Sequence, residues 1–231
     1  MKATNFRVIV QKTIIAILII GVLWSCGPAK SHHADTQALK ETRGTTVVLP
    51  FIDMARAFGS NTSVRSPISS KVFLTGPVDE KADLFLTNEL YRLLGQEKQL
   101  KWGFIPQKEM QIHYGSSDRK MLHLNRLKAL GREKGADTLM IGYLYAFKDR
   151  EGGAYGVESP AQVVFELVLI RTDTGRIVWQ RSYKETQKAL SEDLLQLKTF
   201  IKRKGRWISA KEMSTMALKE MLKSVPHFRT H

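Results

Sequence analysis

The chain has a single cysteine, Cys26, among its 231 residues. One cysteine excludes an intramolecular disulfide and a cluster of thiolate metal ligands. A long apolar run is also lacking near the start, where residues 14–23 form a run of ten and Gln11-Lys12 separates it from residues 8–10. A membrane-spanning helix needs about 20 apolar residues. The run is therefore too short to make a good transmembrane helix.

Acidic side chains are absent from residues 1–25, which carry only the cations Lys2, Arg7 and Lys12. A basic head, a short apolar run and a small residue, in that order, are typical of an export signal. We therefore expect residues 1–25 to be a signal peptide and the remaining 206 of the 231 residues to hold one domain with a proper core or at most two small ones.

The common catalytic and cofactor motifs are missing too. The sequence contains no HExxH, GxSxG, Walker or dinucleotide-binding pattern, and its dispersed histidines lack the spacing of metal ligands. These histidines are His113, His123, His227 and His231. The pair His32-His33 has no third ligand nearby. We expect no catalytic residues, no cofactor and no metal.

The stretch Leu23-Trp24-Ser25-Cys26 resembles the lipobox of bacterial lipoproteins, although Trp24 is bulkier than the usual second residue. The resemblance implies a diacylglycerol thioether on Cys26, cleavage after Ser25 and acylation of the new amino group, with fatty acids such as palmitate. Two or three acyl chains hold a protein firmly on a membrane, whereas one binds marginally. The alternative is a buried thiol in a retained signal anchor.

The resemblance also implies a location in the cell envelope. Gly27 follows the cysteine in place of the aspartate that marks inner-membrane retention in enteric lipoproteins, which favours the periplasmic face of the outer membrane. Residues 26–44 are polar and small, and we expect them to be a flexible tether.

Basic residues outnumber acidic ones, 36 to 22, and without the three signal cations 33 to 22, or +11. In an exported protein we exclude nucleic acid as the partner, which leaves anionic lipids, cell-wall polymers, acidic proteins or a merely solvated surface. One basic cluster precedes the last predicted helix: Lys202, Arg203, Lys204 and Arg206. It is either an anionic-surface contact or a solvated helix junction.

The apolar patterns predict alternating strands and helices. Strands are expected at 45–51, 102–106, 137–147 and 161–170, with the last buried on both faces and returning through Asp173-Thr174-Gly175 as a hairpin to 186. Along that returning strand, Ile177, Trp179 and Tyr183 stand at alternate positions and are expected to share one face of the sheet. Residues 56–77 are expected to be a long loop with an edge strand at 71–74.

Four helices are expected. The first has Asp79 as its N-cap and ends at Gly95, with Ala82, Leu86, Leu90 and Leu94 inward. The others are expected from Asp118 to about Gly135, at 190–201, and after a Ser209/Glu212 capping box. The inner face of the last one is predicted to be Met213, Met216, Ala217 and Met221.

Glu166 is an isolated acid on an otherwise apolar strand. It is either a general base with a raised pKa or, as the commoner case, a carboxylate that faces solvent, lies at the core edge or pairs with a lysine.

Several short motifs together resemble the CsgG, LpoB and TolB-N-terminal group of periplasmic proteins. They are Val47-Val48-Leu49-Pro50-Phe51, Phe104-Ile105-Pro106, the stretch from Gly135-Ala136-Asp137 to Gly142, and Asp173-Thr174-Gly175. The resemblance implies a single α/β domain over residues 45–226, with a mixed, mostly antiparallel sheet flanked by helices. It also implies a role in envelope assembly.

Three function classes follow. We favour a lipid-anchored, non-catalytic interaction or assembly module for an envelope machine, such as cell-wall synthase regulation or a secretion complex. The alternative is an oligomeric, CsgG-like secretion-pore subunit, for which strands 137–147 and 161–170 are long enough but look like core strands. An enzyme is disfavoured because no catalytic constellation is found.

Overall fold

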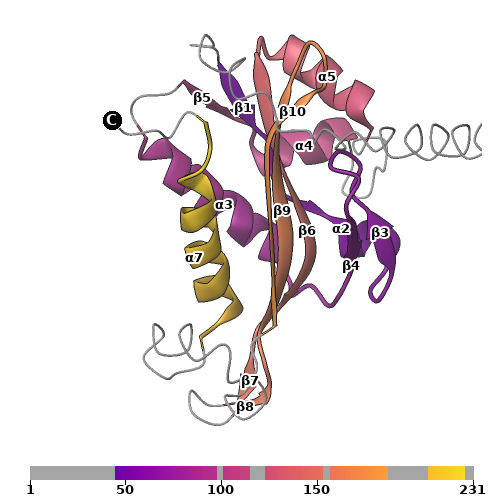
Figure 1. Ribbon diagram of the computed structural model, residues 1–231, viewed down its shortest axis with the longest axis vertical. Helices are drawn as coiled ribbons and strands as arrows, with labels where there is room; N and C mark the ends of the chain where they lie inside the picture. The colour runs from indigo at the N-terminus through magenta and orange to yellow at the C-terminus, as the bar shows by residue number, and fades with distance from the viewer. Residues whose placement is uncertain (1–44, 98–100, 115–122, 153–156, 187–207, 227–231) are drawn as a thin grey trace, which may run out of the picture. The chain divides into compact units, whose positions relative to one another are not determined.

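Two long strands, β6 (Thr138–Lys148) and β9 (Gln162–Arg171), form the centre of the sheet, and nearly all of their residues are buried. The structure is a computed structural model that describes residues 45–97, 101–114, 123–152, 157–186 and 208–226 (Figure 1). Continuous apolar runs without alternation are typical of strands covered on both faces. The prediction of a doubly covered central strand is confirmed.

The main sheet is mixed. Its order is β10 (Ile177–Thr186), β9, β6, β1 (Thr46–Val48) and β5 (Trp102–Phe104), and β2 (Ile52–Asp53) pairs with a later part of β6. The two long ladders, β10 with β9 and β9 with β6, are antiparallel, whereas β1, β2 and β5 join in parallel. The predicted α/β class with a sheet flanked by helices is therefore confirmed.

The β9–β10 hairpin turns at the predicted place. Gly175 has a φ of +75°, a left-handed conformation that glycine adopts without strain. A β-bulge between Ile177 and Trp179 then breaks the alternation, so that Ile177 packs on one face of the sheet and Trp179 and Tyr183 on the other. The prediction that these three side chains share a face was wrong because of the bulge.

Helices α3 (Ala82–Gly95) and α7 (Ala210–Leu222) lie side by side on one face of the sheet (Figure 1). The four predicted inward residues of α3 are all buried. In α7 the Ser209/Glu212 capping box is present, but Met216 is 53% exposed. The buried stripe runs through Met213 and Ala217 toward Leu218, and at about 100° per residue Met216 falls on its far side.

The opposite face is covered by α5 (Leu124–Glu133), α2 (Met54–Phe58) and a separate hairpin of β3 (Ser63–Arg65) and β4 (Val72–Leu74). The prediction of a long loop at 56–77 was therefore wrong in part, although its edge strand is confirmed as β4. A further helix, α4 (Gln107–Tyr114), was not predicted. The short pair β7 (Glu151–Gly152) and β8 (Val157–Ser159) follows β6 (Figure 1).

Asp79 is not the N-cap of α3, contrary to prediction. The cap position is Lys81, in a left-handed conformation with φ of +62° and no side-chain capping bond. The Asp79 carbonyl oxygen accepts from the Ala82 N–H at 3.1 Å. The Asp79 carboxylate instead accepts from the backbone N–H of Asp149, after β6. In the second predicted helix, His123 is the N-cap, and Asp118 lies outside the described residues.

Gly142, in the middle of β6, leaves room for the ring of Phe51. A Cβ built at Gly142 would lie 2.6 Å from that ring, which also meets Phe165 edge-on at a centroid distance of 5.8 Å. The strand needs glycine here because the ring rests directly on its backbone.

We expect Gly142→Ala to destabilise the protein by about 1–3 kcal/mol through overpacking. The matched control is Gly95→Ala, because a Cβ at Gly95 would meet nothing within 4 Å. That change should leave stability equal or raise it by about 0.4–1 kcal/mol. Urea unfolding of both variants measures the difference, and equal midpoints would contradict the packing argument.

Candidate functional site

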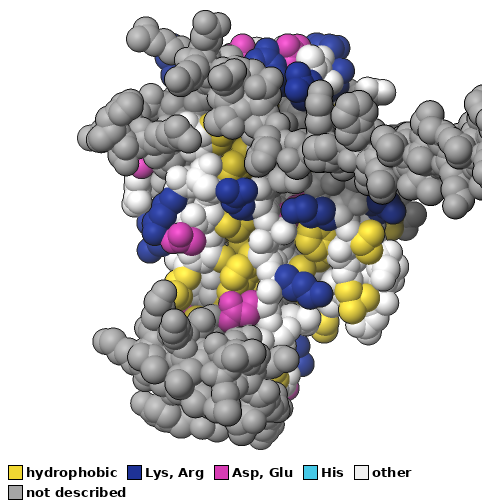
Figure 2. Space-filling view, viewed as in Figure 1, with side chains coloured by type: hydrophobic (Ala, Val, Ile, Leu, Met, Phe, Trp, Pro, Cys, Tyr) yellow, Lys and Arg dark blue, Asp and Glu magenta, His cyan; other side chains and the backbone are white. Residues whose placement is uncertain are grey.

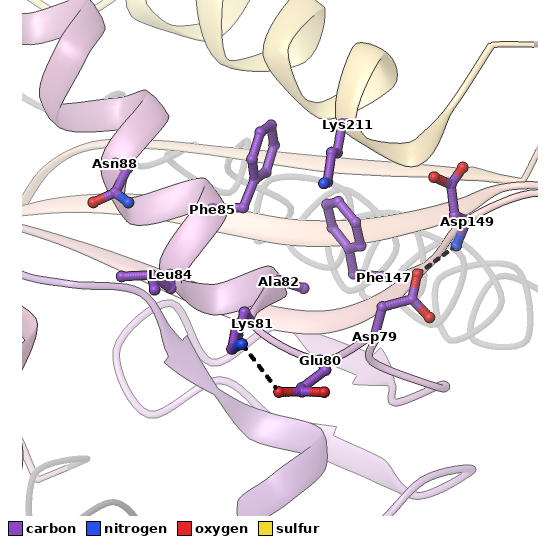
Figure 3. Close-up of a pocket in the computed structure, with 10 residues that line it drawn as sticks. All are labelled: Asp79, Glu80, Lys81, Ala82, Leu84, Phe85, Asn88, Phe147, Asp149 and Lys211. Atoms are coloured by element: carbon purple, nitrogen blue, oxygen red, sulfur yellow. Dashed lines mark hydrogen bonds and ion pairs between the residues drawn. The ribbon is translucent and has the colours of Figure 1, made fainter.

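A groove of about 460 Å³ opens where α3 and α7 begin (Figure 3). It is built from the segment before α3, the first turns of that helix, the end of β6 and the start of α7. Its lining residues are Asp79, Glu80, Lys81, Ala82, Leu84, Phe85, Asn88, Phe147, Asp149 and Lys211. This volume lies in the range of ligand-binding pockets.

The floor of the groove is aromatic. The rings of Phe85 and Phe147 are 6.1 Å apart at an angle of 60°. The Lys211 ammonium lies 5.5 Å from the centre of the Phe85 ring, a distance at which a cation is attracted to the ring face. Figure 3 shows Lys211 reaching from α7 toward both rings. The floor therefore offers apolar surface with a cation at its edge.

Asp149 connects two walls of the groove, the segment before α3 and the start of α7. Its backbone N–H donates to the Asp79 carboxylate at 2.7 Å, and its own carboxylate accepts from the Ala210 N–H at 3.0 Å, in the first turn of α7. An acidic side chain at this place satisfies a free amide and complements the positive end of the helix dipole. Two of the three acids in the groove are thus engaged in holding its walls together.

Glu80 and Lys81 form the exposed rim. Their side chains are 86% and 75% exposed and lie 3.4 Å apart. Leu84 is 37% exposed beside them. An apolar floor with a charged rim suits contact with a protein segment.

A second polar cluster lies inside the core at Glu166. Its side chain is 1% exposed and accepts from the Tyr145 hydroxyl and from the Ser69 hydroxyl, each at 2.8 Å. The expectation of a solvent-facing, core-edge or lysine-paired carboxylate was wrong, because β9 is covered here by the β3–β4 hairpin. The partners are hydroxyl groups from distant parts of the chain.

Burial raises the pKa of the Tyr145 and Tyr143 phenols, and the charge of Glu166 raises both further. Both tyrosines therefore stay protonated, and Tyr145 remains a donor to Glu166. The carboxyl is shut off from solvent, so its geometry suits a structural role and offers an external substrate no access. Glu166 holds the hairpin connection against the sheet through Ser69.

The other predicted site residues are not brought together by the described structure. Cys26 and the basic cluster of Lys202, Arg203, Lys204 and Arg206 lie outside the described residues. Within the described part of the chain, no group of three or more His, Cys, Asp or Glu side chains is placed to hold a metal. No helix in that part is long and apolar enough to span a membrane.

Sequence reasoning missed the groove. Asp149 and Ala210 are 61 residues apart in the sequence, so no local pattern predicts that they contact each other. The nearest signal was the Ser209/Glu212 capping box, which correctly marked the start of α7 at the wall of the groove.

We expect Tyr145→Phe to destabilise the protein by about 1–3 kcal/mol, because it removes a donor from the buried Glu166 carboxyl. Tyr143→Phe is the matched control. The Tyr143 hydroxyl is buried and has no hydrogen-bond partner among the described residues, so its removal should cause little or no loss. Chemical unfolding compares the two, and equal losses would contradict the role assigned to Glu166.

Comparison with known proteins gives structural neighbours only. No family model and no curated protein matches the chain. Similar solved structures include a PelC dodecamer from Paraburkholderia phytofirmans, at 12% identity and a TM-score of 0.45, covering 82% of this chain and 91% of that one. Lipoprotein GNA1162 from Neisseria meningitidis is 12% identical, with a TM-score of 0.38 over 69% of this chain and 96% of that one.

The C-terminal domain of LpoB from Escherichia coli is 13% identical, with a TM-score of 0.37 over 66% of this chain and 90% of that one. The resemblance to the CsgG, LpoB and TolB-N-terminal group stays a prediction.

Proposed function

We propose that this chain is a bacterial lipoprotein, held by Cys26 on the periplasmic face of the outer membrane, and a non-catalytic interaction module of an envelope assembly machine. The observation that carries the proposal is Leu23-Trp24-Ser25-Cys26, placed directly after a basic head and a short apolar run. The net charge of +11 after residue 25 supports partners that are acidic or anionic.

The groove between α3 and α7 is the surface proposed to bind the partner. Its aromatic floor accepts an apolar side chain, and its exposed charges at Glu80 and Lys81 select the polar groups beside that side chain. The frame is fixed before binding by the contacts of Asp149 with Asp79 and Ala210, which lowers the entropy lost on association.

The pore alternative receives no support from the strands that the sequence offered for it. Those strands are β6 and β9, which are buried on both faces in the core. A membrane hairpin needs a lipid-facing side on each strand. We therefore keep the interaction module as the proposed function.

The anchor is tested by metabolic labelling with palmitate in a bacterial host. The wild-type chain and a Ser31→Ala control in the tether should both incorporate label, because neither alters the lipobox. Cys26→Ala should incorporate none, since it removes the sulfur that accepts the diacylglycerol. Label that persists in Cys26→Ala would contradict the proposal.

The groove is tested by a photo-crosslinking amino acid placed at Leu84, at its rim, in intact cells. Met216 is the matched control, because it is also exposed but lies on α7 outside the groove lining. We expect a discrete crosslinked species of an envelope protein from position 84 and none from position 216. Equal yields at the two positions, or no species at either, would count against the groove.

A further inference from the structure

The β3–β4 hairpin has one buried and one exposed face. Its register pairs Ser63 with Leu74, Val64 with Phe73 and Arg65 with Val72. Val64 and Phe73 are buried against the sheet, whereas Val72 is 61% and Leu74 is 55% exposed. These two are the most exposed large hydrophobic side chains in the described part of the chain.

The exposure of Val72 and Leu74 is fixed by the contacts of the opposite face. The Phe73 ring stacks on Tyr145 at a centroid distance of 4.1 Å and an angle of 13°, and Ser69 donates to the buried Glu166. With the inward positions filled, alternation along β4 keeps both apolar side chains in solvent. Val72 and Leu74 therefore form an exposed apolar patch, and such patches with polar neighbours mark contact surfaces.

The charge of this region has one sign. Residues 59–78 contain Arg65 and Lys71 and no Asp or Glu, whereas Arg56, earlier in the chain, is already paired with Asp53 at 3.8 Å. Figure 2 shows yellow side chains over β3 and β4 with dark blue ones close by and no magenta among them. Arg65 donates to the Ser70 carbonyl oxygen at 2.9 Å, and neither Arg65 nor Lys71 forms an ion pair with a described residue.

We propose that the outward face of this hairpin, made of Arg65, Lys71, Val72 and Leu74, rests on the anionic head groups of the membrane to which the chain is anchored. Apolar side chains flanked by cations complement a surface with negative charge outside and hydrocarbon below. An acidic protein would meet the cations but would gain less from two aliphatic side chains than a bilayer does, because hydrocarbon lies just below the charged head groups. The inference rests on the proposed lipid anchor, which keeps the hairpin near a bilayer.

The test uses the full lipidated protein with Val72→Cys carrying an NBD fluorophore, in vesicles of phosphatidylethanolamine and phosphatidylglycerol. The Cys26 sulfur is closed as a thioether, so the introduced thiol takes the label alone. Nitroxide-bearing lipids quench the fluorophore only where it meets the bilayer. Met216→Cys, at 53% exposure on α7, carries the control label. Equal thermal unfolding of the two proteins and the wild type shows that both are folded.

We expect strong quenching at position 72 and none at position 216. The double substitution Arg65→Gln and Lys71→Gln should lower the equilibrium constant for contact between the hairpin and the bilayer about 25-fold, or about fivefold for each cation removed. Replacement of phosphatidylglycerol by phosphatidylcholine should lower the same constant by a similar factor. No quenching at position 72, or equal quenching at both positions, overturns the proposal. Disulfide-linked pairs of unlabelled Val72→Cys chains without quenching would instead assign the face to a second copy.

The mass of the purified chain distinguishes a failure of the lipid anchor from a failure of the hairpin contact. A lipidated chain without quenching at position 72 overturns the hairpin contact and leaves the anchor standing. A chain with a free Cys26 thiol contradicts the anchor and overturns the hairpin contact with it, because that contact depends on the anchor.

Discussion

The structure depends on covering β6 and β9 on both faces. Both strands are apolar along nearly their whole length, so each face of the sheet needs a layer of its own. Helices α3 and α7 supply one layer, and α5, α2 and the β3–β4 hairpin supply the other. The one acid of β6 and β9, Glu166, must then find its partners inside the protein, because water does not reach it. It finds them in Tyr145 and Ser69.

Both proposed contact surfaces follow from this covering. Where β6 leaves the sheet, Asp149 joins the segment before α3 to the start of α7, and the groove forms between them. On the other face, the contacts that hold the hairpin inward turn Val72 and Leu74 outward. The core contacts thus fix two surfaces on different layers of the same sheet.

Long elements with strong apolar patterns were predictable from the sequence, as with β6, β9 and the leucine stripe of α3. Short elements were not: α2 has five residues, and β3 has three, which is too few for a period to be recognised. The environment of Glu166 was unpredictable because Ser69 is 97 residues away from it. Ile177 lies in the predicted strand, but a bulge turns its side chain to the other face of the sheet. Met216 lies in the predicted helix, but the buried stripe of that helix is centred on the opposite side.

The central claim is that this two-sided domain is tied to a membrane by the sulfur of Cys26. The intact mass of the protein extracted from bacterial envelopes tests it most directly. The account predicts a chain that begins at residue 26 and carries a diacylglycerol group with an acylated amino terminus. A chain that retains Met1 and an unmodified cysteine would contradict it.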